Sequence, residues 1–485
     1  MTDQPMSLGA RLGQLARERG DRPAVTDQDR TVTWAQLDRR TNQIARGLEA
    51  AGVKIGDLVT IGLANSVDFI EACYGLWKVG ATPQPISHRL PAAEAQAVMD
   101  LAQTPILISG PSVESDRPRF DVPALLALGK DDSPLPDRTA PVWKAPTSGG
   151  STGRPKLILS GGAGVYTPVD VGGYRTTPED IMVMPGPLYH NGPFTASFAG
   201  LNQGAHLIIL PRFDAEATLA AIDRHAATWI YLVPTMMSRI WRLEPEVRGR
   251  YRVSTLQTAW HLAAPCPPWL KEAWIEWLGP DVIMELYAGT EAQAVTIITG
   301  TEWLEHRGSV GKVAVGEMAA FDAGGNRLPP GEIGEVFMRR PEGEPASYRY
   351  LGAEARTLPG GWESLGDIGS FDADGYLYLA DRRTDMILVG GSNVYPAEIE
   401  SALDEHPLVQ SSAVIGLPDE DLGSRVHAIV QPRPGLSEEA LREHVRGLLV
   451  TYKQPRSYEF VSENIRDDAG KVRRTQLRAE RLPAG

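Results

Sequence analysis

Amphipathic helical segments alternate with short apolar runs through the first 300 residues, and this alternation limits the folds open to the chain. Thr33 and Gln36 have capping-box spacing, and apolar residues then recur on one helical face until Gly52. The run LVTIGLA predicts a strand, and the helix that follows it ends at Gly80. Strands that alternate with helices predict sheets covered by helices, and hence an α/β protein.

The texture of the sequence changes after about residue 300. Residues 308–340 carry many glycines between short alternating runs, which predict a small β-barrel region. From about residue 385, helical and strand segments predict a compact α+β unit. Because 485 residues exceed the size of one hydrophobic core, we expect two domains. They are a large α/β domain of stacked mixed sheets with the β-barrel region over 1–381, and a small mobile α+β domain over 382–485.

Composition excludes several classes of protein. The 61 acidic residues outnumber the 48 basic ones, giving a net charge of −13, which argues against nucleic acid as a partner. No apolar run approaches the ~18 residues that span a bilayer, and the N-terminal segment lacks a signal-peptide core, so we expect no membrane span. Cys73 and Cys266 form no metal or disulfide pattern, and they suit a reducing cytoplasm, where we expect the protein to act.

The segment from Thr147 to Lys156, TSGGSTGRPK, has the composition of a phosphate-binding loop. Its glycines allow backbone N–H groups to point into one concavity, while hydroxyls and a lysine add donors and positive charge. It is not a Walker A loop, but it contains GxSxG at Ser151. A hydrolase nucleophile elbow would need a helix directly after that serine, whereas Pro155 and the run LIL indicate a strand. The hydrolase and a plain Gly/Ser-rich surface loop remain as alternatives.

This segment resembles the phosphate loop of the adenylate-forming superfamily, which includes acyl-CoA synthetases, luciferases and peptide-synthetase adenylation domains. Gly149 departs from the serine or threonine that is commoner there. Further motifs follow in the family's order and cover nearly the whole chain. The resemblance implies ATP, Mg²⁺ and coenzyme A as cofactors and a small-molecule carboxylic acid as substrate. The implied phosphate-loop residues are Ser148, Gly150, Ser151, Thr152, Gly153 and Lys156.

Two segments are similar to the family's adenine-binding and Y-G-x-T-E motifs. In ELYAGTEA, the resemblance implies that Thr290 contacts the α-phosphate and Glu291 holds Mg²⁺. One carboxylate beside a hydroxyl suits an ion that also binds phosphate oxygens, although an isolated glutamate is more often a solvated surface acid. The implied nucleotide-binding residues of these segments are Ala263, Ala264, Pro265, Glu285 and Tyr287.

Two motifs near the predicted domain boundary resemble the family's ribose and hinge segments. In GWESLGD, Asp367 is the expected ribose ligand because one carboxylate can accept hydrogen bonds from two vicinal hydroxyls. A turn aspartate is the alternative. In DRRTD, Arg382 matches the arginine that reaches ribose and phosphate, and Thr384 occupies the hinge position.

Two more segments correspond to the two faces that the family's small domain presents in turn. GKVRR resembles the motif whose lysine bridges the acyl carboxylate and the α-phosphate, which implies a catalytic Lys471. A solvated basic cluster is the alternative. The loop of Gly390, Gly391, Ser392 and Tyr395 corresponds to the thioester-forming side, or else contains an ordinary β-turn glycine pair.

The substrate is suggested only by similarity to synthetases of bile-acid, steroid and other bulky acids. His190 lies where the family has a group between the carboxylate and the thiol, although a lone histidine is more often structural. The implied acyl-pocket residues are Tyr231, Val233, Met236 and Ala288. We therefore expect ligation of a hydrophobic acid, of which a polycyclic terpenoid or steroid acid is one candidate, to coenzyme A.

Two other readings stay open. One is an enzyme limited to a half-reaction or serving a carrier-protein thiol, and the other is a nucleotide-binding pseudoenzyme. A homodimer is compatible with the sequence.

Overall fold

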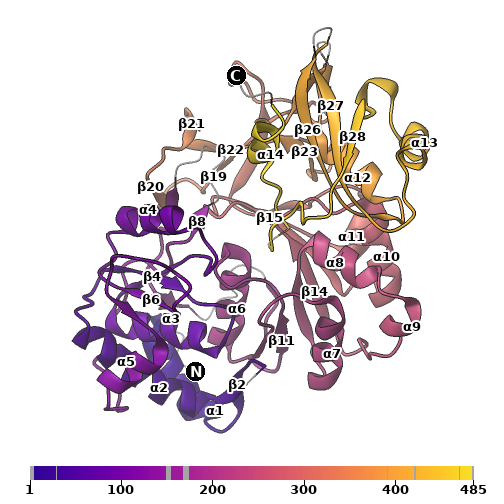
Figure 1. The fold of residues 1–485 in the computed structure, drawn as a ribbon. Helices are drawn as coiled ribbons and strands as arrows, with labels where there is room; N and C mark the ends of the chain where they lie inside the picture. The colour runs from indigo at the N-terminus through magenta and orange to yellow at the C-terminus, as the bar shows by residue number, and fades with distance from the viewer. Residues whose placement is uncertain are drawn as a thin grey trace.

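The computed structural model describes residues 5–28, 30–148, 155–167, 174–389, 392–419, 422–468 and 470–482. A large N-terminal body, indigo to pink in Figure 1, carries a smaller orange-to-yellow part at its top. This arrangement confirms the predicted fold class of a large α/β domain and a small C-terminal domain. Within these ranges, no helix is long and apolar enough to cross a membrane.

The largest sheet of the N-terminal body has nine strands in the order β17-β16-β15-β14-β13-β11-β12-β2-β3. Its central pairs are parallel, while β15 to β17 and the pair β2–β3 run antiparallel. The strands are β2 (Pro23–Thr26), β3 (Thr31–Thr33), β11 (Ile181–Met184), β12 (His206–Ile209), β13 (Trp229–Leu232), β14 (Thr258–Leu262), β15 (Ile283–Ala288), β16 (Val295–Thr299) and β17 (Lys312–Val315).

A second, four-stranded parallel sheet has the order β5-β4-β6-β7. It consists of β4 (Leu58–Gly62), β5 (Thr82–Pro85), β6 (Leu107–Ser109) and β7 (Arg119–Phe120). The helices of the N-terminal body are α1 (Leu8–Arg19), α2 (Trp34–Ala50), α3 (Val67–Val79), α4 (Ala92–Ala102), α5 (Val122–Leu128), α6 (Asn191–Gln203), α7 (Ala215–His225), α8 (Pro234–Trp241), α9 (Pro245–Arg248), α10 (Pro268–Leu278) and α11 (Gly300–Glu305).

One hydrophobic core joins the two sheets through the helices between them. Trp77 of α3 meets Phe198 of α6 with ring centroids 4.7 Å apart and nearly perpendicular planes, a favourable aromatic arrangement. Local signals read from the sequence are confirmed here. Thr33 and Gln36 form a complete capping box on α2, and α3 ends at Gly80 with a φ of 83°.

Smaller sheets connect the large body to the C-terminal part. Three strands form one of them: β8 (Thr147–Ser148), β9 (Lys156–Ser160) and β20 (Tyr348–Leu351). A five-stranded antiparallel sheet stands where the sequence predicts a small β region, with β18 (Glu317–Phe321), β19 (Gly334–Arg339), β21 (Arg356–Leu358), β22 (Trp362–Phe371) and β23 (Leu377–Arg382). A short pair joins β1 (Met6–Ser7) to β10 (Val165–Tyr166). The predicted domain boundary, after residue 381, falls one residue before the end of β23, and pairing with β22 holds Arg382 on the N-terminal side.

The C-terminal part has its own core beneath a three-stranded sheet. The sheet consists of β26 (Val409–Asp419), β27 (Gly423–Pro432) and β28 (Ser457–Phe460), and a hairpin of β24 (Ile387–Val389) and β25 (Ser392–Val394) precedes it. The helices are α12 (Pro396–Asp404), α13 (Glu438–Leu448), the 3₁₀ helix Thr451–Lys453 and α14 (Arg474–Ala479).

Candidate active site

A first polar cluster joins the end of β15 to β22 and β23. The Tyr287 hydroxyl donates to Asp367 Oδ2 at 2.6 Å, and Arg382 Nε donates to Asp367 Oδ1 at 3.3 Å. Antiparallel pairing of β22 with β23 sets Asp367 opposite Arg382, so the backbone register fixes this contact. Asp367 raises the pKa of Arg382, and burial followed by Asp367 raises the pKa of Tyr287. Tyr287 therefore remains a neutral donor and Arg382 remains a cation.

A second cluster surrounds Glu291, whose side chain is 5% exposed. Antiparallel pairing of β9 with β20 sets Tyr350 opposite Ile158, and Lys156 lies two residues from Ile158, on the same face of β9. The Tyr350 hydroxyl donates to Glu291 Oε1 at 2.5 Å and accepts from Lys156 Nζ at 3.3 Å. Lys156 Nζ also lies 3.6 Å from Glu291 Oε1 and 4.3 Å from the centre of the Tyr350 ring. Burial and the Glu291 charge raise the pKa of Tyr350, so the phenol stays neutral.

The second carboxylate oxygen of Glu291 suits a magnesium ion. Among the described residues, Oε1 receives the contacts from Tyr350 and Lys156, whereas Oε2 has no hydrogen-bond partner. A Cβ on Gly289 would come within 2.9 Å of Oε2, so the glycine keeps space open beside that oxygen. A hard cation held by one or two carboxylates and by substrate phosphates matches this donor set. Thr290, which lies between Gly289 and Glu291 in the sequence, is partly exposed.

The C-terminal part brings Lys471 to these clusters. In Figure 1 the yellow chain near α14 descends toward β15. Lys471 is exposed to solvent, but many protein atoms surround its ammonium group. They partly desolvate the ammonium and lower its pKa. The positive charge of Arg382 lowers this pKa further, while Asp467 and Glu291 act in the opposite direction. Lys471 therefore shares one electrostatic environment with residues of both clusters.

Close packing seats the Lys471 loop on the N-terminal body. Gly470 has a φ of 76°, and a Cβ on it would lie 2.6 Å from Thr235 Oγ1 and 3.4 Å from Val233 Cγ2. The Tyr189 hydroxyl donates to Asp468 Oδ1 at 2.5 Å. The loop and the α8 region therefore touch directly.

His190 lies under this loop as the N-cap of α6. Burial, followed by the positive charge of Lys471, lowers the pKa of His190 to about 4. The imidazole is therefore neutral at pH 7, and its ring stands 4.4 Å from the ring of Tyr189. A neutral imidazole can donate or accept a hydrogen bond without adding charge to the site.

The predicted adenine segment follows β14 at the carboxyl edge of the large sheet. Ala263, with a φ of 74°, begins it and is followed by Ala264 and Pro265. Glu285 lies on the neighbouring strand β15, but its carboxylate accepts from Lys271 of α10 at 2.5 Å and is 5% exposed. The structure therefore places Glu285 in a buried ion pair beside the predicted nucleotide site.

The predicted acyl-pocket residues surround the start of α8 and the end of β15. Tyr231, Val233 and Met236 are buried, and Ala288 is half-buried. A Cβ on Gly192 would lie 2.4 Å from the Tyr231 hydroxyl oxygen, so Tyr231 packs directly on the first turn of α6. Tyr231 therefore meets α6, while Val233 meets the Lys471 loop at Gly470.

Several predicted residues stand apart from these clusters or outside the described residues. The second group contains Gly150, Ser151, Thr152, Gly153, Gly390 and Gly391. Ser148 ends β8, Ser392 begins β25 and is exposed, Tyr395 is the N-cap of α12, and the Thr384 hydroxyl lies 3.4 Å from Asp385 Oδ1. Among the described residues, no hydrogen bond or ion pair joins the β24–β25 hairpin to the Lys156–Glu291 cluster.

Three contact residues have no signal in the motifs. Tyr350 is 59 positions from Glu291, and Tyr189 is 279 positions from Asp468. Tyr189 directly precedes His190, and Asp468 lies two residues before the glycine of GKVRR, but neither position indicates a contact between them. Strand pairing and domain packing were needed to find them.

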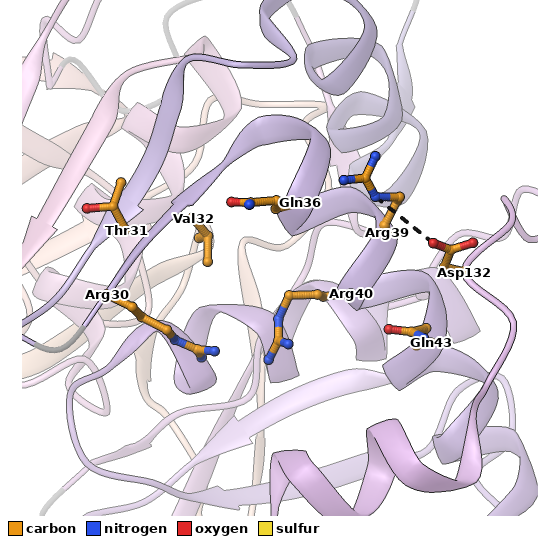
Figure 2. Close-up of a pocket in the computed structure, with 8 residues that line it drawn as sticks. All are labelled: Arg30, Thr31, Val32, Gln36, Arg39, Arg40, Gln43 and Asp132. Atoms are coloured by element: carbon orange, nitrogen blue, oxygen red, sulfur yellow. Dashed lines mark ion pairs between the residues drawn. The ribbon is translucent and has the colours of Figure 1, made fainter.

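A separate cavity of about 310 Å³ lies on α2, far along the chain from these residues (Figure 2). Arg30 and Arg40 both contact Glu71, which is fully buried, and Arg39 lies 4.0 Å from Asp132. Because each arginine is matched by an acid, this cavity has the charge balance of a structural ion-pair cluster.

Comparison with known proteins assigns the chain. The model of the AMP-binding enzyme family matches residues 13–344, and that of the AMP-binding enzyme C-terminal domain matches residues 398–471. The chain is 30% identical to a methyl-dioxo-octahydroindenyl-propanoyl:CoA ligase of Rhodococcus jostii, over 99% of this chain and 100% of that protein. It is 31% identical to the fatty acid–[acyl-carrier-protein] ligase ScoC of Streptomyces coeruleorubidus, over 94% and 93%.

A solved structure shares the whole architecture. The o-succinylbenzoate CoA synthetase of Bacillus subtilis, in complex with its acyl-adenylate intermediate, superposes with a TM-score of 0.82 at 25% identity, over 98% of each chain. Both family models fall in order on the two parts of the fold, and together they cover most of the sequence. The chain therefore belongs to the AMP-binding enzyme family, as an adenylate-forming enzyme of the acyl-CoA synthetase type.

Proposed function

We propose that this chain activates a hydrophobic carboxylic acid with ATP, forming an acyl-adenylate and pyrophosphate, and then transfers the acyl group to coenzyme A. The observation that carries the proposal is the seating of the Lys471 loop on the N-terminal body. There Lys471 lies within the electrostatic reach of Arg382, Glu291 and His190. Attack of a carboxylate on a phosphate brings two anions together, so converging cations address the main barrier.

Each cluster has a part in this first step. Asp367 would accept hydrogen bonds from the ribose hydroxyls, while Tyr287 holds one of its oxygens in place. Lys156 and Lys471 would stabilise phosphate and carboxylate charge, and Thr290 would donate to the α-phosphate. Mg²⁺ bound at Glu291 would supply further positive charge to the phosphate oxygens. The mechanism needs no nucleophilic side chain of the protein.

Thioester formation would use the other face of the C-terminal part. Among the described residues, no hydrogen bond or ion pair joins the hairpin that contains Ser392 to these clusters, so a rotation near Thr384 would bring it to the acyl-adenylate. The thiol sulfur would attack the acyl carbon, its proton would leave to solvent, and AMP would depart. The neutral His190 would line this route without attracting the anionic leaving group.

Two observations bear on the acid. Tyr231, Val233 and Met236 give the predicted pocket an apolar wall, which suits a hydrophobic acid better than an amino acid. The relative from Rhodococcus jostii is named for a bicyclic dioxo acid, which makes a polycyclic acid a reasonable first candidate.

A carrier-protein thiol is the second candidate acceptor. The relative ScoC, which is named for an acyl-carrier-protein acceptor, is as similar to this chain as the CoA ligase is.

One experiment tests the proposal. Pyrophosphate release and loss of CoA thiol are followed in parallel with ATP, Mg²⁺ and a panel of steroid, diterpenoid, aryl, straight-chain and amino acids. Both signals should rise with a hydrophobic acid. Pyrophosphate without thiol loss would move the acceptor to a carrier protein, and turnover with amino acids alone would contradict the substrate class.

A further inference from the structure

Lys144 is a buried lysine beside the candidate site, and its positive charge has no carboxylate partner among the described residues. Its side chain is 7% exposed. The other two buried lysines, Lys78 and Lys271, each contact an acid, Asp38 at 2.6 Å and Glu285 at 2.5 Å. Since an ionised group is costly to bury without a counter-charge, Lys144 stands out from both.

The surroundings of Lys144 consist of neutral acceptors on the first turns of α6. Its ammonium donates to Asn191 Oδ1 and, at 2.6 Å, to Thr195 Oγ1, and it stands 4.5 Å from the centre of the Trp143 ring. An ammonium has three donors, so one donor has no acceptor among the described residues. Asn191 and Thr195 are partly exposed, so this cluster is not sealed inside a core.

The electrostatic setting makes the missing acceptor more significant. The helix α6 places the partial positive charge of its N-terminus next to Lys144, and its first turn carries no acidic residue. Burial lowers the pKa of Lys144 to about 7, and no charged group among the described residues offsets that effect. A ligand with a carbonyl or carboxylate oxygen would relieve both problems.

The position of Lys144 relates it to the acid. Asn191 directly follows His190, whose pKa responds to Lys471. Thr195 lies five residues beyond His190, which corresponds to roughly 7 Å along the axis of α6. Gly192, between Asn191 and Thr195, packs on Tyr231 of the predicted acyl pocket. An acceptor bound by Lys144 would therefore lie along the first turns of α6, next to that pocket and apart from the reacting carboxylate.

We propose that Lys144, together with Asn191 and Thr195, binds a ketone or second carboxylate on the acid substrate, distant from the carboxylate that reacts. This inference rests on the proposed acid-activating function and narrows its substrate class to acids with a distal hydrogen-bond acceptor. The apolar wall of the pocket would hold the carbon skeleton, and the Lys144 cluster would select the polar group.

The test uses matched acids and matched variants. Pairs of cyclic acids carry either a ketone or a methylene at the same carbon, and the ketone is moved along the skeleton from pair to pair. With saturating ATP, kcat/KM is measured for the wild type, Lys144→Met and Thr195→Val. For at least one pair the wild type should prefer the keto acid by ~10-fold or more, because unpaired polar groups penalise the acid without the acceptor. Lys144→Met should reduce the preference to about twofold, because the ketone loses its donor and the methylene acid no longer leaves an ammonium unpaired.

A buried lysine on the other side of the core supplies the control. Lys78→Met removes an ammonium that is paired with Asp38, so it should leave the keto preference intact whatever it does to stability. Thr195→Val keeps the side-chain shape and removes one acceptor of the cluster. It therefore tests the site even if Lys144→Met does not fold. An equal loss for both acids in Lys144→Met would reduce Lys144 to a structural residue. A raised KM for ATP with every acid would assign it to the nucleotide instead.

A binding measurement separates this inference from the proposed function. Calorimetric titration of the keto and methylene acids into the protein needs no turnover. If no acid gives pyrophosphate, yet the wild type binds the keto acid more tightly than Lys144→Met does, the acceptor site stands and the proposed reaction fails. If pyrophosphate appears but no pair shows a preference in rate or binding, the acceptor site is wrong.

Discussion

The two halves of the candidate site are held in place by different kinds of contact. In the N-terminal half, strand pairing sets Asp367 beside Arg382, and the buried Glu291 is locked by Tyr350. In the C-terminal half, Lys471 remains exposed, and its loop reaches the body through close packing and through Asp468, which accepts a hydrogen bond from the Tyr189 hydroxyl.

Strand register cannot change without breaking a sheet, whereas a small polar interface can separate. The comparison teaches that the predicted nucleotide-binding contacts are held by strand pairing, while the position of Lys471 depends on an interface between the two parts. Removing residues from each half should therefore have different kinetic signatures.

The largest effect is expected for Lys471→Ala. Loss of a preorganised cation should slow acyl-adenylate formation by ~10²-fold or more, and transfer from preformed acyl-adenylate should change far less. Single-turnover pyrophosphate release and thioester formation measure the two steps. Equal losses in both half-reactions would contradict the assignment of Lys471 to one step.

A smaller but specific effect is expected in the rigid half. Glu291→Gln should weaken activation by Mg²⁺ strongly, and Tyr350→Phe should weaken it by ~10-fold, because the phenol orients the carboxylate. Titration of the adenylation rate with Mg²⁺ at fixed ATP measures both. Tyr348→Phe, which removes a hydroxyl bonded to Glu363 instead, serves as the control. An unchanged Mg²⁺ dependence in Glu291→Gln would remove the metal from this carboxylate.

A variant at the interface between the two parts should slow adenylation by a smaller factor, and it should not slow thioester formation. Tyr189→Phe removes the hydrogen bond to Asp468, which at about 1 kcal/mol corresponds to a roughly fivefold loss in the population of this orientation. Adenylation should slow by that factor, while transfer from preformed acyl-adenylate should be unchanged or faster. Slowing of both steps together would show that the contact does not distinguish the two orientations.

The smallest effect concerns His190 and pH. Its pKa of about 4 in the folded protein lies below the ordinary value of 6.5, so the folded state binds fewer protons than the unfolded state between these values. His190 therefore costs stability as the pH falls from 6.5 toward 4. His190→Ala should unfold less readily than the wild type in that range relative to pH 8, as measured by urea titration. Because His190 stays neutral near pH 6.5, its titration should not contribute to the pH profile of the adenylation rate there. The wild type and His190→Ala should therefore have profiles of the same shape near pH 6.5.

The order of motifs could be predicted because local chemistry encodes it. The β strand after Pro155 excludes the helix that a nucleophile elbow requires, and the structure has β9 there. Asp367 and Arg382 could be proposed together because each belongs to a recognisable motif. Glu285 was also proposed for the nucleotide, but its buried contact with Lys271 depends on how α10 packs on the sheet, and no spacing reveals that.

The sequence by itself determined the helix and strand segments, the two-part organisation and the ordered motifs, because these depend on periodicity and on residues near one another in the chain. Only the tertiary structure decided that Tyr350 orients Glu291, that Asp468 meets Tyr189, and that Lys144 has no acidic partner within the part of the chain that the structure describes. The partners in the first two contacts are 59 and 279 residues apart, and Lys144 is 47 residues from Asn191. Contacts at such separations are set by the order of strands and the docking of two domains, which bring together side chains that carry no mutual signal in the sequence.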